Sequence, residues 1–323
     1  MARALPDAWH DAIEIVSGFV APIALSLPLF DPRHFSAVDH VGGFVVGCFR
    51  TFHRRTLEAM KFTLLVCQGL LIFALPVAAQ TIPDPVPDAN PARPTVSTPA
   101  TLTPVGYLQF ETGSLGATTS PEFGTRIGIN QVTKLTVMPR LELLVLTEPY
   151  IHSSNSKGGD KEIHPGEVFA GAQAVLLPGD GAMPTIAVSY IRRLYESPAP
   201  ELDIGTNRQS GTILLSNDMA GFHFDVNFIV TEETEFGTRR AQTGQTLSIS
   251  HQLKKFTISG ELWHFTQPYF ASNAVGNLWA LSYPIRRNLV IDGGFDHGLT
   301  STSTHWEEFI GFTYLLPHRL WRR

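Results

Sequence analysis

The stretch FHFDVNF, residues 222–228, decides the fold class of this chain. Phenylalanine and valine occupy its even-numbered positions, and histidine, aspartate and asparagine occupy the odd-numbered ones. A period of two places successive side chains on opposite faces of a β-strand, whereas a helix repeats its faces every 3.6 residues. The stretch therefore predicts a strand with one apolar face and one polar face.

The same alternation recurs on both sides of this stretch. Runs rich in strand-forming residues are separated by clusters of Gly, Pro, Asn and Asp, and no run between 105 and 316 has helical periodicity over a useful length. We predict about twelve strands, over 105–112, 125–137, 141–152, 167–177, 185–195, 210–217, 222–231, 241–253, 256–265, 276–284, 289–296 and 305–316.

Composition excludes several other classes of protein. The chain has 323 residues, of which 43% are hydrophobic and only 16% are charged. This is too apolar for a disordered chain. Its mean hydropathy of +0.05 is too low for a bundle of membrane-spanning helices. A net charge of −5 gives no support for nucleic acid as a partner.

An export signal is predicted over residues 60–79. Lys61 precedes the apolar run 62–75, and Val77 and Ala79 then occupy the −3 and −1 positions of a cleavage site after Ala79. A single transmembrane anchor is the alternative, but the run is shorter than the ~20 residues that a helical span needs. Residues 1–59 are then an upstream extension that is not part of the native product.

The remaining chain divides into three parts. Residues 80–104 contain seven prolines, which exclude a helix or a central strand and predict a Pro-rich linker acting as a plain spacer. Residues 105–316 form the strand region, and residues 317–323 form a basic C-terminal tail. Cys48 and Cys67 both precede the predicted cleavage site, so the exported chain lacks cysteine, which suits an oxidising compartment.

An even number of strands of about ten residues, after a signal peptide, is typical of an all-β, antiparallel, up-and-down transmembrane β-barrel. We therefore expect the outer membrane of a Gram-negative-type bacterium as its location. A soluble periplasmic β-sandwich that binds a ligand is the alternative, because its strands also alternate.

Connections and aromatic residues refine this prediction. Tight basic turns near Lys134 and Arg140, at 254–255 and at 286–287 are expected to face the periplasm, and the longer segments 153–166, 198–209 and 232–240 the outside. Aromatic girdles are expected from the residues near strand ends, namely Tyr107, Tyr150, Tyr195, Trp263, Phe265, Tyr269, Trp279, Tyr283, Trp306 and Tyr314.

Three stretches of the strand region resemble a known family of porin-like outer-membrane transporters, the "MetA pathway of phenol degradation" family. They are 125–150 around Pro139, 166–190 with Pro184 and Tyr190, and 289–314 with Trp306 and Gly311. The resemblance implies a barrel that transports small molecules, aromatic or hydrophobic ones among them.

The predicted function is a passive channel for small molecules, and a non-conducting structural barrel is the alternative. The expected partners are outer-membrane lipid, a small-molecule solute and the barrel-assembly machinery during biogenesis, with no nucleic acid. We expect no cofactor. The polar residues predicted to face the lumen and bind the solute are His223, Asp225, Asn227, Ser259, Glu261 and Asp292.

Enzymatic and metal sites are not favoured by the sequence. Five histidines could pair with many serines, but the chain has no Gly-x-Ser-x-Gly motif, and a triad is defined by geometry that a sequence does not supply. Asp292, Asp296 and His297 could share a face, yet polarity of the lumen explains them more simply. We therefore predict that the chain is not an enzyme, with no catalytic residue and no metal site.

Overall fold

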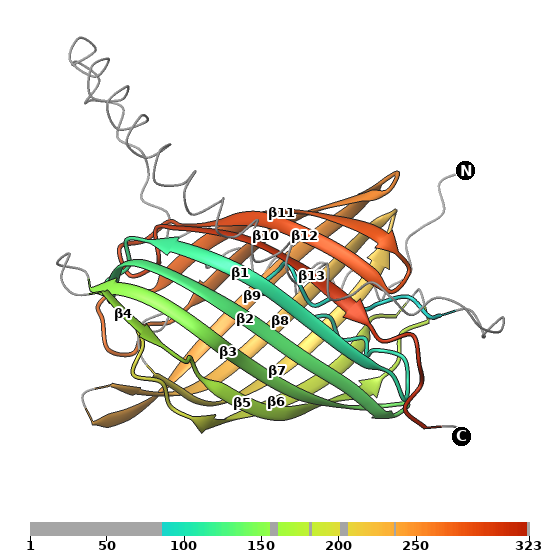
Figure 1. Ribbon diagram of the computed structural model, residues 1–323, viewed down its shortest axis with the longest axis horizontal. Coiled ribbons are helices and arrows are strands. Elements are labelled where there is room, and N and C mark those ends of the chain that lie inside the picture. The colour runs from blue at the N-terminus through green and yellow to red at the C-terminus, as the bar shows by residue number, and fades with distance from the viewer. Residues whose placement is uncertain (1–85, 156–160, 181–182, 201–205, 236, 322–323) are drawn as a thin grey trace, which may run out of the picture. The chain divides into compact units, whose positions relative to one another are not determined.

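The alternating runs form strands, and these strands close into a barrel (Figure 1). The computed structural model describes residues 86–155, 161–180, 183–200, 206–235 and 237–321, which belong to one compact unit, Ile82–Arg323. The predicted extension 1–59 and signal peptide 60–79 lie outside the described residues. Within the described ranges, no helix is long and apolar enough to cross a membrane.

Thirteen strands occur in the described part of the chain, and 12 of them make up the barrel, because β4 pairs only with β3. The strands are β1 (Leu108–Thr118), β2 (Phe123–Met138), β3 (Leu141–Asn155), β4 (Lys161–His164), β5 (Val168–Leu177), β6 (Thr185–Tyr195), β7 (Thr206–Met219), β8 (Phe222–Glu235), β9 (Thr238–Leu253), β10 (Phe256–Phe265), β11 (Ala274–Arg286), β12 (Leu289–Gly298) and β13 (Trp306–Leu315).

Closure comes from the pairing of the first strand with the last. β1 and β13 are antiparallel, in a register that runs from Gln109 opposite Leu315 to Thr118 opposite Trp306. Apart from this closing pair, each barrel strand pairs with the next barrel strand along the chain. The predicted up-and-down antiparallel barrel is thereby confirmed. A β-sandwich is excluded, because one continuous sheet meets itself instead of packing against a second sheet.

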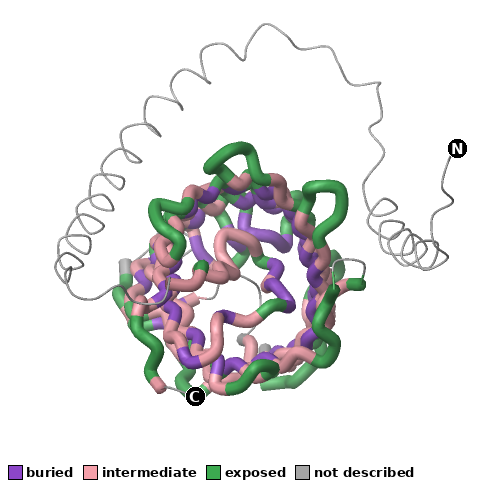
Figure 2. Tube along the Cα trace, turned by 90° about the vertical axis from the view of Figure 1, so that its right-hand side faces the viewer, coloured by how far each residue is buried: buried purple, intermediate pink, exposed green. Residues whose placement is uncertain are grey.

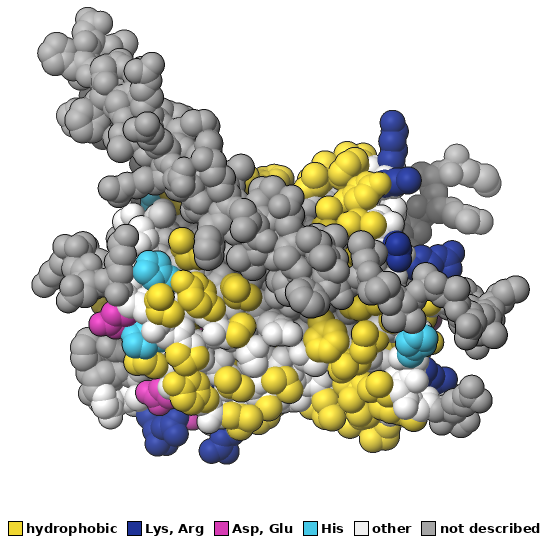
Figure 3. Space-filling view, viewed as in Figure 1, with side chains coloured by type: hydrophobic (Ala, Val, Ile, Leu, Met, Phe, Trp, Pro, Cys, Tyr) yellow, Lys and Arg dark blue, Asp and Glu magenta, His cyan; other side chains and the backbone are white. Residues whose placement is uncertain are grey.

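The two faces of the sheet differ sharply in polarity. Apolar side chains on the outer face are exposed, as shown by Trp279 at 54% and Leu281 at 45%, and Figure 3 shows them gathered over the side of the barrel. Polar side chains of the inner face are buried, with Asn227 at 1% exposure and Glu261 at 4%. This pattern is the reverse of that in a water-soluble protein, and it suits a barrel with lipid outside and a polar lumen inside.

Short turns gather at one end of the barrel. The β7–β8 connection is only Ala220 and Gly221, whose φ angles of 53° and 83° are those of a hairpin turn that requires positive φ at both positions. The tight turns at 139–140, 254–255 and 287–288 lie at the same end, as do the start of β1 and the end of β13.

Two details of the predicted turns are wrong. Most of 232–240 is strand, because β8 continues to Glu235 and β9 starts at Thr238. Lys134 lies within β2, and its ammonium group pairs with the carboxylate of Glu111 at 2.5 Å on the inner face. The strands are thus longer than their apolar runs, since pairing with a neighbour continues past the last hydrophobic residue.

Two residues of the predicted aromatic girdle, Trp263 and Phe265, point the other way, and their ring centroids lie 5.9 Å apart. Trp263 is only 6% exposed, its indole N–H donates to Asp296 at 2.7 Å, and its ring covers Gly276 on β11, where a Cβ atom would come within 2.1 Å. It therefore packs inside the barrel. Its position near a strand end suggested a girdle, but its odd-numbered register with Glu261 places it on the inner face.

Replacing an outward apolar residue by a charge should destabilise the barrel in a bilayer. We expect Leu281→Arg, on the exposed face of β11, to lower the free energy of unfolding by about 2–4 kcal/mol if it sits near the bilayer midplane. Urea unfolding in phospholipid vesicles, followed by tryptophan fluorescence, measures this change. Leu281→Ala is the control for lost side-chain volume. An arginine variant as stable as the alanine variant would contradict a lipid-facing outer surface.

Candidate functional site

The six residues predicted to face the lumen all lie on the inner face. Asp225, Asn227, Ser259, Glu261 and Asp292 are buried, and His223 is half-buried close to the short-turn end of β8. They belong to three strands, and their side chains share the lumen because each has the inward register of its strand. Their role in binding a solute stays a prediction.

His223 and Asp225 form a local polar cluster with neighbouring β7. The two ring nitrogens of His223 lie 2.8 Å from Asp218 Oδ1 and 3.2 Å from Asp225. The hydroxyl of Ser216 donates to Asp225 at 2.5 Å. This cluster orients the inward polar groups of β7 and β8 at the short-turn end.

The main occupant of the lumen is part of the chain itself. Residues 90–103, called the inner loop below, contact inward side chains of nine of the 12 barrel strands. Figure 2, a view onto one end of the barrel, shows a chain segment inside the ring of strands. Over its described residues the predicted spacer is therefore bound to the wall: proline excludes regular structure but leaves amide groups free to bind side chains.

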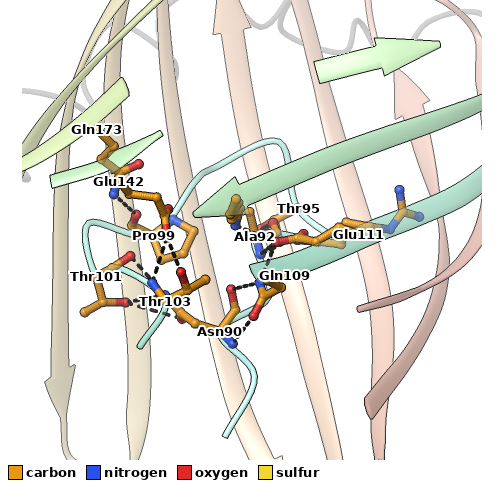
Figure 4. A network of polar contacts seen from close by, with 12 residues as sticks. Asn90, Ala92, Thr95, Pro99, Thr101, Thr103, Gln109, Glu111, Glu142 and Gln173 are labelled. Atoms are coloured by element: carbon orange, nitrogen blue, oxygen red, sulfur yellow. Dashed lines mark hydrogen bonds and ion pairs between the residues drawn. The ribbon is translucent and has the colours of Figure 1, made fainter. Parts of the chain in front are cut away.

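The inner loop begins against β1. The side-chain amide of Gln109 pairs with the backbone of Asn90 in both directions, accepting from its N–H at 2.9 Å and donating to its C=O at 2.7 Å. Next to it, the carboxylate of Glu111 accepts the backbone N–H groups of Ala92 and Arg93 at 3.0 and 3.1 Å. Figure 4 shows this part of the network.

Arg93 then reaches β12 and β2. Its guanidinium group donates to Asp292 at 3.2 Å and to Asn130 at 3.1 Å. It lies over Gly113 and Gly311, which are paired across β1 and β13, and a Cβ atom on either glycine would come within 3 Å of the guanidinium. Only glycine leaves space for the guanidinium at these two positions. Gly113, Gly311, Asp292 and Asn130 therefore form a site on the wall that matches Arg93 in shape and charge, called the Arg93 seat below.

The next contacts are with β10, β9 and β8. The carboxylate of Glu261 accepts the backbone N–H groups of Val96 at 2.7 Å and Ser97 at 2.6 Å, and also the Ser97 hydroxyl at 2.5 Å. The Ser97 hydroxyl lies 2.7 Å from that of Thr246. Asn227 pairs with the backbone of Thr98 in both directions, at 2.7 and 2.9 Å.

The inner loop ends against β7, β5, β3 and β2. The N–H of Ala100 donates to Ser216 at 2.7 Å, and the C=O of Pro99 accepts from Gln173 at 2.9 Å. The N–H and hydroxyl of Thr103 both donate to Glu142, at 2.9 and 2.5 Å. Figure 4 includes the Gln173 and Glu142 contacts.

The two ends of the inner loop also meet each other. The side-chain amide of Asn90 donates to the backbone C=O of Thr101 at 2.9 Å. Taken in chain order, the wall contacts pass from β1 through β12, β10, β9 and β8 to β7 and β5 and then to β3 and β2, which follows the order of the strands around the barrel. Two contacts depart from that order: Pro99 meets β5 before Ala100 meets β7, and Arg93 also reaches Asn130 on β2. The inner loop therefore makes one circuit along the inner wall.

Among the wall residues of this network that sequence reasoning missed are Gln109, Glu111, Glu142 and Gln173. All four lie within predicted strands, and a strict count of alternate positions would have placed them inward. What the sequence does not reveal is their partner, because the contacted backbone groups carry no side-chain signal and lie up to 74 residues away. Lys134 was missed because it was assigned to a turn.

A second set of ion pairs lies toward the end with the longer connections. Arg126, 2% exposed, donates to Glu148 at 2.8 Å, and Arg193 donates to Glu167 at 2.9 Å and to Glu196 at 2.9 Å. Glu167 immediately precedes β5. Burial raises its pKa from the ordinary 4.5 to about 7, because the loss of hydration outweighs the attraction of Arg193.

Metal chemistry finds no support in the described ranges, where no group of three or more His, Cys, Asp or Glu side chains could hold an ion. What the wall offers is instead a set of hydrogen-bonding groups around a lumen. A closed antiparallel barrel with an apolar outer face and a polar, charged inner wall defines a porin-like transmembrane barrel.

Comparison with solved structures finds porins and channels. The chain matches the NanC porin with 9% identity and a TM-score of 0.46 over 64% of this chain and 98% of that one. It matches the KdgM porin with 12% identity and a TM-score of 0.44, over 64% and 98%. The corresponding values for the CymD monoaromatic hydrocarbon channel are 8%, 0.41, 67% and 90%. No protein-family model and no curated protein matches the sequence. Because these TM-scores are below 0.5 and the identities are 12% or less, the matches carry no argument about function. The functional proposal below is therefore based on the geometry of the barrel.

The ionisation of Glu167 should make stability depend on pH. Its pKa is higher in the folded protein, so its contribution is fully present below pH 4.5 and is lost as the pH rises through about 7. Across this window we expect the melting temperature of the wild type to fall relative to that of Glu167→Gln, as measured in detergent micelles. Glu196→Gln, which removes an exposed partner of the same arginine, is the control. A relative rise in the wild type would contradict the assignment.

Proposed function

We propose that this protein is an outer-membrane channel through which small molecules pass passively. One observation carries the proposal: the wall encloses a whole polypeptide segment. A lumen that admits the inner loop is wider than its own inward side chains can fill, unlike the packed interior of a narrow barrel. The outer face meets lipid in this proposal, and the barrel-assembly machinery inserts the chain.

The chemistry of the wall indicates the class of solute. Its buried inward residues are mostly Ser, Thr, Asn, Gln, Asp and Glu, which favour solutes that form hydrogen bonds over hydrocarbons. The resemblance to phenol-pathway transporters adds hydroxylated aromatic molecules as candidates, and this finer assignment stays a prediction. The six predicted lumen residues are proposed to contact the solute as it passes.

A non-conducting structural barrel is the second candidate. The same inner loop favours it, because a segment bound to the wall around a full circuit reduces the free cross-section. The two functions differ in one measurable property, which is the flux of ions or solutes across a membrane that contains the folded protein.

Conductance in planar bilayers tests the proposal. The purified, folded protein should give discrete current steps in KCl, and vesicles that contain it should swell in neutral sugars below a size limit and in a phenolic solute. Protein unfolded by boiling is the control for detergent artefacts. Folded protein that gives neither current nor swelling would favour the structural barrel.

Charge on the inner wall should influence ion selectivity. We expect Asp225→Asn to reduce the preference of the pore for K⁺ over Cl⁻, because a carboxylate in the lumen attracts cations. The reversal potential in a KCl gradient measures this shift. Asp180→Asn removes the same charge from the exposed β5–β6 turn and should leave the reversal potential unchanged. Equal effects of the two substitutions would place Asp225 outside the ion path.

A further inference from the structure

We propose that the inner loop is the constriction of the pore: it stays bound to the wall while the pore conducts, and it sets both the width of the lumen and the charge that a solute meets. This inference rests on the channel function proposed above. It assigns the property to residues 90–103, which precede the first strand, rather than to a connection between strands.

The path of the inner loop is the first argument. A tether crossing the lumen would touch two regions of the wall, whereas this segment follows the strands in order around the barrel and closes on itself through Asn90 and Thr101. A chain bound along the wall narrows the lumen from its circumference inward. Most of its contacts lie on the halves of the strands nearest the short turns, and those with Asn130 on β2 and Glu261 on β10 lie just past the strand midpoints.

The fit of the wall to the inner loop is the second argument. Gly113 and Gly311 leave the space that Arg93 fills, and Asp292 beneath it supplies the opposite charge, with a side chain only 1% exposed. Gln109 and Asn227 each bind one backbone unit through both its N–H and its C=O. These contacts fit the backbone of the inner loop at fixed positions along the wall, and they oppose release of the inner loop from the wall.

The inner loop also covers negative charges of the wall. Four inward carboxylates, those of Glu111, Glu142, Glu261 and Asp292, accept hydrogen bonds from the inner loop. Backbone N–H groups and one guanidinium thereby lie between these charges and the lumen. A pore with the inner loop in place should be less cation-selective than its wall alone would be.

Deleting the inner loop tests the proposal directly. In the full chain, residues 90–103 are replaced by two glycines, a feasible link because Asn90 and Thr101 are in contact. We expect a several-fold larger single-channel conductance and a reversal potential shifted toward that of K⁺. A faster unboiled band on an SDS gel establishes that the shortened barrel has folded.

The outcomes of this deletion separate the two proposals. Equal conductance and equal selectivity in both proteins would overturn the constriction while leaving the channel. Conductance only after the deletion would also overturn it, because the inner loop would then be a plug that blocks the pore. Current from neither folded protein would overturn the channel function and the constriction with it.

The screening of charge has its own test. Glu261→Gln should shift the reversal potential strongly in the protein without the inner loop, and little in the intact protein, where Val96 and Ser97 cover this carboxylate. Equal shifts in the two backgrounds would show that the inner loop screens nothing, and would overturn this part of the proposal.

A point variant covers the case in which the shortened barrel does not fold. Arg93→Ala uncovers Asp292 and should raise cation selectivity in the full chain. Arg140→Ala removes the same charge from an exposed turn at the same end and should not. Identical reversal potentials for the two variants would overturn the role assigned to the Arg93 seat.

A disulfide tests whether the inner loop stays seated during conduction. The hydroxyls of Ser97 and Thr246 lie 2.7 Å apart, so Ser97→Cys combined with Thr246→Cys should form a disulfide. The only native cysteines, Cys48 and Cys67, precede the region described by the structure. We expect the same conductance before and after reduction with dithiothreitol. Current that appears only after reduction would show that the inner loop must leave, and would overturn the proposal.

Discussion

The barrel depends on the pairing of β1 with β13, because this pair closes the sheet. A sheet with two free edges would expose rows of backbone N–H and C=O groups, and in hydrocarbon each unpaired group costs several kcal/mol. The antiparallel register between Gln109–Thr118 and Trp306–Leu315 removes both edges at once. With the edges gone, the outer face can be apolar and the inner face can enclose a polar space. The lumen and its occupant are thus consequences of closure.

Much of the fold could be predicted because each strand carries its own two-residue period. The predictions for β6 and β10 agree with the structure at both ends, and the inward position of Asp225 and Asn227 follows directly from FHFDVNF. β1 was predicted over 105–112 but spans Leu108–Thr118. Its second half contains Gly113 and Gly116, which suggest a turn, and pairing with β2 and β13 overrides that local preference.

The contents of the lumen could not be predicted in the same way. The prolines of 80–104 correctly exclude regular structure there, yet they say nothing about where an irregular segment goes. Its position is decided by contacts such as that of Arg93 with Asp292, 199 residues away in the chain. Gly113 and Gly311 were likewise unremarkable as residues of a strand. The two glycines are needed because Arg93 lies over them, and neither the strand pattern nor the composition reveals that contact.

The inner loop also has a topological consequence. Ala89, just before it, donates its N–H to Arg287 in the β11–β12 turn, and β1 begins at the same end of the barrel a few residues after it. Both ends of the inner loop therefore lie at the short-turn end of the barrel. The described chain enters and leaves the lumen through this one opening and does not pass through the barrel from end to end. The inner loop can enter a finished barrel, so seating need not precede closure. The relative rates of insertion and closure decide which comes first during assembly.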